Sequence, residues 1–296
     1  MRSLLFVPGD STRKLDKALQ AGADALILDL EDSVASSEKG TARRVSAEFL
    51  RAVRPQAARP RLFVRVNALT TGLTDDDLEA VMAAAPDGIM LPKAIGGSDV
   101  AHLGAKLAVW EAEFGLEDRA TRIIAIATET ARGVFALGTF AGASDRLVGL
   151  TWGGEDLSAD VGAEANRADG GAYCEPYRLV RSLTLFGAAA ARADAIDTVF
   201  TNFRDEAGLA VECREARRDG FVAKMAIHPA QVPIINEAFT PSPEALARAH
   251  AVIDAFARAP GAGVVGLDGE MLDLPHLHRA ERVLARAMRQ PRRREA

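Results

Sequence analysis

Short apolar runs recur along the chain, and an amphipathic stretch typical of a helix follows each of them. Within each run the apolar residues are nearly continuous, as in parallel strands that are buried on both faces. Eight such runs alternating with helices favour a (β/α)₈ TIM barrel over an open doubly wound sheet, the alternative architecture. The predicted strands cover residues 4–7, 25–30, 62–66, 88–91, 123–128, 147–151, 195–200 and 221–226.

Turn and capping residues delimit several of the predicted helices. Ser11 or Thr12 starts a helix over 14–21 that stops at Gly22, and Thr74 precedes three aspartates that favour a helix N-terminus. After the eighth run, the Thr-Pro-Ser-Pro segment at 240–243 introduces a helix over 244–258, and another covers 278–289, with no further strand of the barrel period. We therefore expect a barrel domain over 1–240 and a small helical C-terminal extension over 241–296.

Composition narrows the class of protein. The 296 residues are 48% hydrophobic and 26% charged, a balance typical of a folded enzyme. The formal charge of −5 gives no global electrostatic basis for binding nucleic acid. The N-terminal apolar stretch is too short for a signal sequence and no run reaches a membrane span, while the two cysteines form no Cys-x-x-Cys pair. These features predict a cytoplasmic protein without membrane or nucleic-acid partners.

Charged residues follow the predicted strands at their carboxyl ends, where TIM barrels place their catalytic groups. Carboxylates outnumber the cations in this set, so a divalent cation or tight ion pairs must balance them. The set comprises Asp29, Glu31 and Asp32 after the second strand, Arg65 and Asn67 at the third, Lys93 at the fourth, Glu129 at the fifth, and Glu155 and Asp156 after the sixth.

Glu129 and Asp156 follow consecutive strands, and such a pair could hold one metal ion. Two carboxylates without a nearby Cys or His favour Mg²⁺ or Mn²⁺ over Zn²⁺, with water and substrate oxygens completing the coordination. For any one of these carboxylates, pairing with Arg65 or Lys93 or capping a helix is an equally good interpretation. Spacing alone does not choose between Glu155 and Asp156.

Seven segments together resemble the citrate lyase beta-subunit-like proteins of the HpcH/HpaI aldolase family over residues 2 to 240. A later segment, GEMLDLPHLHRA, resembles the C-terminal part of the malyl-CoA, methylmalyl-CoA and citramalyl-CoA lyase branch. The seven segments are, in order, LLFVPGDSTRKLDKAL, LILDLEDSV, LFVRVNA, GIMLPKA, ATETARG, TWGGEDLSADVGA and AIHPAQVPIINEAF.

The resemblance implies a TIM barrel that binds Mg²⁺, and acts on a carbon–carbon bond next to a CoA thioester. It implies that Glu129 and Asp156 are the metal ligands, Glu129 also facing the substrate. Arg65 would bind the 2-oxo acid and help to hold the thioester enolate. Such proteins are usually homotrimers, and a dimer of trimers is a further possibility.

The resemblance assigns roles around this centre as well. Glu31 and Asp32 would order metal-bound waters, with Lys93 beside them. Asp273 would be the catalytic acid–base residue, supplied by the C-terminal segment to a neighbouring subunit; its sequence context alone favours a helix N-cap. Arg13 and Lys14 follow the first strand, where cations could meet CoA phosphates.

We therefore expect a Mg²⁺-dependent lyase that cleaves citramalyl-, malyl- or methylmalyl-CoA to acetyl- or propionyl-CoA plus pyruvate or glyoxylate. Removing the hydroxyl proton and holding an enolate requires a Lewis acid and a positive group, which Mg²⁺ and Arg65 would supply. Two alternatives stay open: a CoA-independent metal-dependent 2-oxo-acid aldolase, and a citryl lyase subunit that depends on an acyl carrier.

Overall fold

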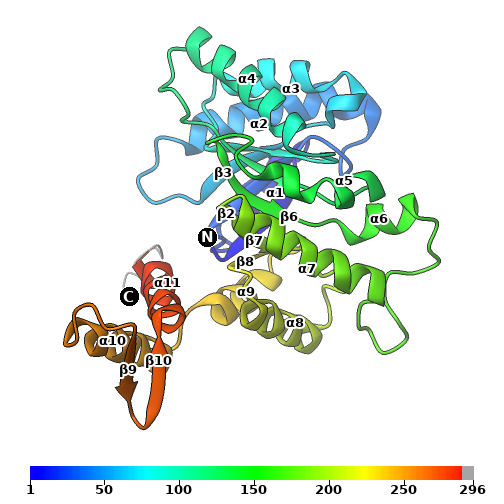
Figure 1. The fold of residues 1–296 in the computed structure, drawn as a ribbon. Helices are drawn as coiled ribbons and strands as arrows, with labels where there is room; N and C mark the ends of the chain where they lie inside the picture. The colour runs from blue at the N-terminus through cyan, green and yellow to red at the C-terminus, as the bar shows by residue number, and fades with distance from the viewer. Residues whose placement is uncertain (289–296) are drawn as a thin grey trace. The chain divides into compact units, whose positions relative to one another are not determined.

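The computed structural model describes residues 1–288, and eight parallel strands in it close into a barrel (Figure 1). Each strand pairs with the next along the chain, and the eighth pairs with the first. The TIM barrel is confirmed and the open sheet is excluded. The strands are β1 (Ser3–Pro8), β2 (Ala25–Asp29), β3 (Arg61–Arg65), β4 (Gly88–Leu91), β5 (Arg122–Ile126), β6 (Leu147–Thr151), β7 (Asp194–Asp197) and β8 (Ala223–Ala226).

Each predicted strand coincides with an observed one, and the differences lie at the ends. The fifth and seventh strands stop at Ile126 and Asp197, earlier than predicted, because the following residues leave the ladder to form loops at its carboxyl end. The helices between strands are α1 (Thr12–Leu19), α2 (Lys39–Val53), α3 (Thr74–Met82), α4 (Gly97–Glu113), α5 (Ala131–Phe135), α6 (Gly154–Asp160), α7 (Glu175–Ala190) and α8 (Glu206–Asp219), with short 3₁₀ turns at Ser36–Glu38, Leu69–Thr71 and Leu137–Phe140.

A buried network of charges lies between the last two strands and their helices. Lys224 of β8 and Asp197 of β7 are both fully buried, and Lys224 Nζ lies 2.9 Å from Asp197 Oδ2. The same ammonium donates to Glu212 of α8 at 2.7 Å, while Asp197 Oδ1 accepts from Trp152 Nε1 at 2.9 Å and from Arg181 of α7 at 3.2 Å. Every one of these charges therefore has a partner of opposite sign.

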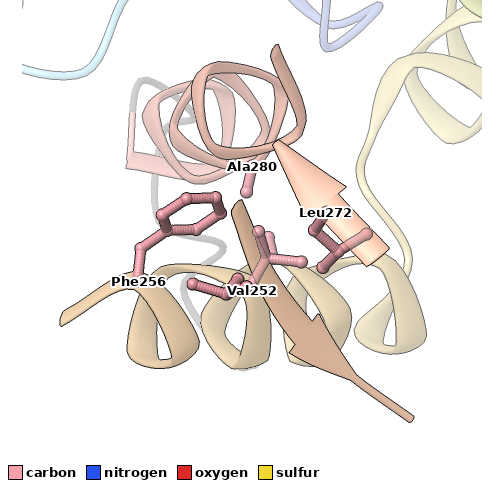
Figure 2. Packing of buried hydrophobic residues seen from close by; sticks show 6 residues of the cluster. Val252, Phe256, Leu272 and Ala280 are labelled. Carbon is pink, nitrogen blue, oxygen red and sulfur yellow. The ribbon is translucent and has the colours of Figure 1, made fainter. Parts of the chain in front are cut away.

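The chain divides into two compact units, residues 2–236 with the barrel and a smaller unit from residue 237 onward. Helix α9 (Gln231–Phe239) crosses the division. In the smaller unit, α10 (Pro243–Ala257) and α11 (Leu274–Met288) pack around Val252, Phe256, Leu272 and Ala280 (Figure 2). The predicted helices over 244–258 and 278–289 correspond to these two, although Arg289 lies outside the described residues.

The C-terminal extension contains the two predicted helices and, in addition, a β-hairpin that was not predicted. Strands β9 (Val264–Leu267) and β10 (Glu270–Asp273) pair antiparallel around a two-residue turn. Asp268 and Gly269 both have positive φ, 53° and 81°, as a tight hairpin turn requires. The Asp-Gly pair between two short apolar segments was the signal that could have predicted it.

No helix among residues 1–288 combines the length and the apolar character needed to cross a bilayer.

Candidate functional site

The carboxyl ends of strands β2 to β6 bring the predicted charged residues onto one rim of the barrel. Asp29 and Arg65 are the last residues of β2 and β3 and face each other in the strand register. Lys93 and Glu129 follow β4 and β5 in the connecting loops, and Asp156 lies in the first turn of α6, after β6. Parallel strands end at the same side of a barrel, so chain positions more than a hundred residues apart converge here.

Arg65 is held in place by a bidentate ion pair with Asp29. Its Nε lies 2.7 Å from Asp29 Oδ1 and its Nη2 2.6 Å from Oδ2, and the guanidinium stacks 4.9 Å from the ring centre of Phe6. Burial alone would raise the pKa of Asp29, but the Arg65 guanidinium outweighs it and lowers that pKa. Two of the five N–H groups of Arg65 are used in this way, which leaves three that do not bond to Asp29.

Lys93 joins both sides of the rim. Its backbone is left-handed, with φ of 51°, a conformation that costs about 1 kcal/mol in a residue with a side chain. In this conformation its main-chain N–H donates to Glu129 Oε2. Its ammonium lies 2.5 Å from Glu31 Oε1, 3.1 Å from Asp32 Oδ2 and 3.5 Å from Asp156 Oδ1. One residue thus positions four carboxylates.

Glu31 combines a buried carboxylate with an unsatisfied oxygen. Burial raises the pKa of Glu31, opposed by Arg65 and Lys93. Its Oε2 lies 2.8 Å from Arg65 Nη1 but accepts no hydrogen bond within residues 1–288, because no N–H points at it. Such an oxygen suits a water or a substrate proton. The main chain beneath it is fixed by Lys39, whose Nζ donates to the carbonyl oxygens of Leu30 and Glu31 at 2.7 Å each.

Glu129 is the carboxylate whose negative charge is least well stabilised. Its side chain is 3% exposed, and burial, followed by the nearby Asp156, raises its pKa to about 8. It fits here because Gly153 has no side chain: a Cβ at that position would lie 2.5 Å from Glu129 Cγ. Gly153 is thus a site residue that the sequence interpretation missed.

Asp156, rather than Glu155, faces this cluster. Asp156 contacts Lys93 and raises the pKa of Glu129, whereas Glu155 Oε1 accepts a hydrogen bond from Asn166 at 2.8 Å. The structure thus places Asp156, and not Glu155, beside Glu129 and Lys93. Asn67, also predicted at the rim, serves the scaffold instead: its main-chain N–H and its amide donate to the buried Asp77 of α3 at 2.7 Å. Asp77 therefore not only lies in the first turn of α3 but also accepts hydrogen bonds that fix Asn67.

The rim carries an excess of negative charge. Five carboxylates face only two cations, which leaves three negative charges unbalanced when all the groups are ionised; the carboxylates are Asp29, Glu31, Asp32, Glu129 and Asp156, and the cations Arg65 and Lys93.

The donor set of the rim suits a hard divalent cation. Asp156 lies close enough to Glu129 for its charge to raise the pKa of Glu129, and a cation between them would remove this repulsion. Nowhere in residues 1–288 do three or more His, Cys, Asp or Glu side chains form a ready metal site. Two carboxylates, with waters and substrate oxygens, are the usual protein contribution to a Mg²⁺ site.

Three predicted site residues lie outside this cluster. Arg13 and Lys14 are exposed on α1, after β1, and make no ion pair within the described chain. Asp273 belongs to the smaller unit, where it ends β10 and precedes α11. Its Oδ1 lies 2.5 Å from His276 Nδ1, and this hydrogen bond lowers the pKa of Asp273.

Comparison with known proteins agrees with the resemblance seen in the sequence motifs. The model of the family described as HpcH/HpaI aldolase/citrate lyase matches residues 2–229. A citrate lyase subunit beta-like protein of Mycobacterium tuberculosis is 38% identical over 96% of this chain and 94% of its own. A (3S)-malyl-CoA thioesterase of Cereibacter sphaeroides is 36% identical over 97% of this chain and 94% of its own.

A solved structure gives the same result in three dimensions. The crystal structure of the protein CitE from Mycobacterium tuberculosis in complex with magnesium, acetoacetate and coenzyme A aligns with a TM-score of 0.75. It is 37% identical in sequence, and the alignment covers 97% of this chain and 98% of that one. Magnesium and coenzyme A, the predicted cofactor and carrier, are therefore both present in a protein of the same fold.

Proposed function

Because the chain belongs to the HpcH/HpaI aldolase/citrate lyase family, a family of lyases, we propose that it is a Mg²⁺-dependent lyase acting on a 3-hydroxyacyl-CoA thioester. The proposed substrates are citramalyl-, malyl- and methylmalyl-CoA, and the products acetyl- or propionyl-CoA plus pyruvate or glyoxylate. The observation that carries this proposal is the buried, poorly stabilised Glu129 beside Asp156, on a rim that also presents Arg65.

Glu129 and Asp156 are the proposed ligands of the cation. When bound, the cation would supply Lewis acidity to the oxygens of the substrate and balance the excess negative charge of the rim. Gly153 leaves room for the Glu129 side chain, and the main-chain N–H of Lys93 orients its carboxylate. Glu31 and Asp32, both paired with Lys93, would position water beside the site.

Arg65 would bind the negative oxygen that develops during cleavage. When the bond between the two carbons breaks, its electron pair passes to the carbon next to the thioester, and the resulting enolate oxygen needs a fixed positive charge. Asp29 holds the Arg65 guanidinium by two hydrogen bonds, so the group needs little reorganisation during the reaction. The remaining N–H groups are available to the 2-oxo acid or the enolate.

Asp273 is the proposed acid–base residue, and Arg13 with Lys14 the proposed contacts of the CoA phosphates. The hydrogen bond between the Asp273 carboxylate and His276 lowers the pKa of Asp273 and so favours its ionised form. A carboxylate can accept a proton from one carbon compound and return it to another, as reversible carbon–carbon cleavage requires. We further propose that the chain assembles as a homotrimer, in which this residue serves a neighbouring subunit.

The test is turnover of the purified protein with citramalyl-, malyl-, methylmalyl- and citryl-CoA, each with Mg²⁺ and with excess chelator. We expect a 2-oxo acid and a shortened acyl-CoA, and loss of both when the metal is removed. Release of free CoA and an intact hydroxy acid would instead identify thioester hydrolysis, the reaction named for the Cereibacter relative. Inertness toward all four esters would favour a carrier-dependent subunit or a CoA-independent aldolase.

The role of Asp273 can be tested separately. Asp273→Asn should keep the Mg²⁺ affinity of the protein but lose about 100-fold or more in kcat, because it removes proton transfer and leaves the metal ligands in place. Unchanged turnover in this variant would exclude Asp273 from the reaction. Sedimentation of the wild-type protein would measure the proposed trimer independently.

A further inference from the structure

One side chain joins the two segments that carry the proposed metal ligands. Glu129 and helix α5 follow β5, whereas Asp156 lies in the first turn of α6, after β6, and Asp160 is the last residue of that helix (Figure 1). The main-chain N–H of Ala131 donates a hydrogen bond to Asp160 Oδ2 at 2.8 Å. Ala131 is the first residue of α5 and stands two positions after Glu129. Asp160 therefore fixes α6 to the segment that carries Glu129.

The spacing of these residues places the two segments in register. Asp156 and Asp160 are four residues apart on α6, so their side chains lie on the same face of the helix, about 6 Å apart along its axis. Thr130 has extended backbone, with φ of −130° and ψ of 151°, so Glu129 and Ala131 are about 6.6 Å apart. The two spacings match, and both carboxylates of α6 can therefore face the segment after β5 at the same time.

Asp160 is a poor choice of residue for the helix in which it lies. It ends α6, where the negative end of the helix dipole disfavours a carboxylate. It also lies one turn from Asp156, and like charges four residues apart on a helix repel each other. The last turn of α6 contains no basic residue that would offset either effect. A residue that breaks two local rules is expected to have a compensating role elsewhere, and the hydrogen bond to Ala131 provides one.

Two other contacts hold Glu129, but they act on its side chain. The main-chain N–H of Lys93 donates to its Oε2, and Gly153 leaves space for its Cγ. A change in the tilt of α6 about Gly153 would move Asp156 away from Glu129 without breaking either contact. The hydrogen bond accepted by Asp160 opposes this motion, because it ties the far end of α6 to the main chain after Glu129.

We propose that Asp160 is a positioning residue that sets the distance between Glu129 and Asp156, and thereby raises the affinity of the rim for a divalent cation. The inference rests on the proposed function, which makes those two carboxylates the ligands of the cation. Asp160 acts through the main chain of Ala131 and is not itself a ligand. Contacts that orient a metal ligand typically change metal affinity by about 10- to 100-fold.

The experiment measures the binding of Mg²⁺ to the purified protein by calorimetry, without substrate. Asp160→Ala should weaken binding by about 10-fold, because α6 loses its hydrogen bond to Ala131. Asp160→Asn keeps an oxygen that can accept the same hydrogen bond and should bind Mg²⁺ nearly as tightly as wild type. Asp160 is exposed, so neither variant disturbs the core. Glu164→Ala is the matched control, since it removes another exposed carboxylate a few residues further along the chain, outside α6.

Turnover provides a second readout of the same variants. At limiting Mg²⁺, kcat/KM of Asp160→Ala for the CoA ester should fall by about the factor lost in affinity, about 10-fold. At saturating Mg²⁺ most of the rate should return, because the groups that contact the substrate are unchanged. A rate that stays low at saturating Mg²⁺ would contradict a role in setting metal affinity.

Glu129→Gln separates failure of this inference from failure of the proposed function. If wild type and Glu129→Gln bind Mg²⁺ equally, the rim is not the metal site and the proposed function fails. If Glu129→Gln loses binding while Asp160→Ala binds like wild type, the inference alone is overturned. Equal losses in Asp160→Asn and Asp160→Ala would show that the charge of Asp160 acts, rather than its hydrogen bond, and would also overturn it. A lower free energy of unfolding with unchanged Mg²⁺ affinity would assign Asp160 a purely structural role.

Discussion

The barrel contains two dense clusters of charge, and they differ in the ratio of carboxylates to cations. In the network around β7 and β8, three carboxylates meet four cations, namely Asp197, Glu212 and Asp219 with Arg167, Arg181, Arg218 and Lys224, so that every carboxylate has a partner. On the rim, five carboxylates meet two cations. Buried charges that are paired and hydrogen-bonded are compatible with a purely structural role, whereas unbalanced ones need a further positive ligand.

The titration properties of the two clusters follow this difference. Burial would raise the pKa of Asp197, but Lys224 and Arg181 outweigh it and lower that pKa. Glu129 forms no ion pair within residues 1–288, and the nearby Lys93 charge only partly offsets burial and Asp156, so its pKa is raised to about 8. The comparison indicates that burial does not by itself mark a functional group. A lack of compensating positive charge does.

The largest expected effect is on turnover. Glu129→Gln and Asp156→Asn should each lower Mg²⁺-dependent kcat/KM by about 10³-fold or more, because each removes one of the two protein ligands of the cation. Neither should lower the free energy of unfolding of the metal-free protein. Glu113→Gln, on the exposed end of α4, is the control. Full activity in either rim variant would show that the unbalanced cluster is not the metal site.

Substitutions in the network around β7 and β8 should instead lower the stability of the protein. Lys224→Met should lower the free energy of unfolding by about 3–5 kcal/mol, because it leaves Asp197 and Glu212 buried without their common partner. Urea denaturation measures this, with the exposed Lys17→Met as control.

If Lys224→Met does not fold, further substitutions at its two partners can still test the role of the network. Adding Asp197→Asn and Glu212→Gln to Lys224→Met removes the uncompensated charges and should recover part of the stability. Stability equal to that of wild type in the single variant would contradict the interpretation of this network as a structural element.

A third effect concerns the pH dependence of stability without metal. The folded protein keeps the Glu129 proton up to about pH 8, whereas an unfolded glutamate releases it near 4.5. The folded state binds more protons over this window, so the contribution of Glu129 is fully present below pH 4.5 and is lost as the pH rises through 8. Glu129→Gln should therefore match wild type at low pH and exceed it by roughly 4–5 kcal/mol at pH 8.5.

Paired urea titrations at pH 5 and pH 8.5 in chelator measure this difference. Adding Mg²⁺ at pH 8.5 should stabilise wild type but not Glu129→Gln, because only wild type has the complete ligand pair. If the difference in stability between the two proteins does not change with pH, the Glu129 carboxylate is better stabilised than the structure indicates.

The smallest expected effect comes from the packing of the rim. Gly153→Ala should raise the Mg²⁺ concentration for half-maximal activity by about 10-fold, because the new methyl group displaces the Glu129 side chain. Gly138→Ala is the control, since a Cβ there meets no atom within 4 Å. Identical Mg²⁺ dependence in the two variants would mean that Glu129 tolerates displacement.

The sequence was informative about the rim for a simple reason. A parallel barrel places the residue after every strand on the same side, so locating the strands was enough to gather Arg65, Lys93, Glu129 and Asp156. It was less informative about the smaller unit. There the hairpin around Asp268 and Gly269 escaped notice, because short strands outside a repeating pattern offer only a turn signal.

The chain by itself determined the strand order, the closed barrel and the identity of the charges on the rim, because these follow from the periodicity of apolar residues. Only the tertiary structure decided which partner each charge takes. Asp197 and Lys224 balance each other because β7 and β8 are neighbours, and Gly153 makes room for Glu129 across two loops. Distances between side chains depend on packing in three dimensions, and no local pattern in the sequence encodes them.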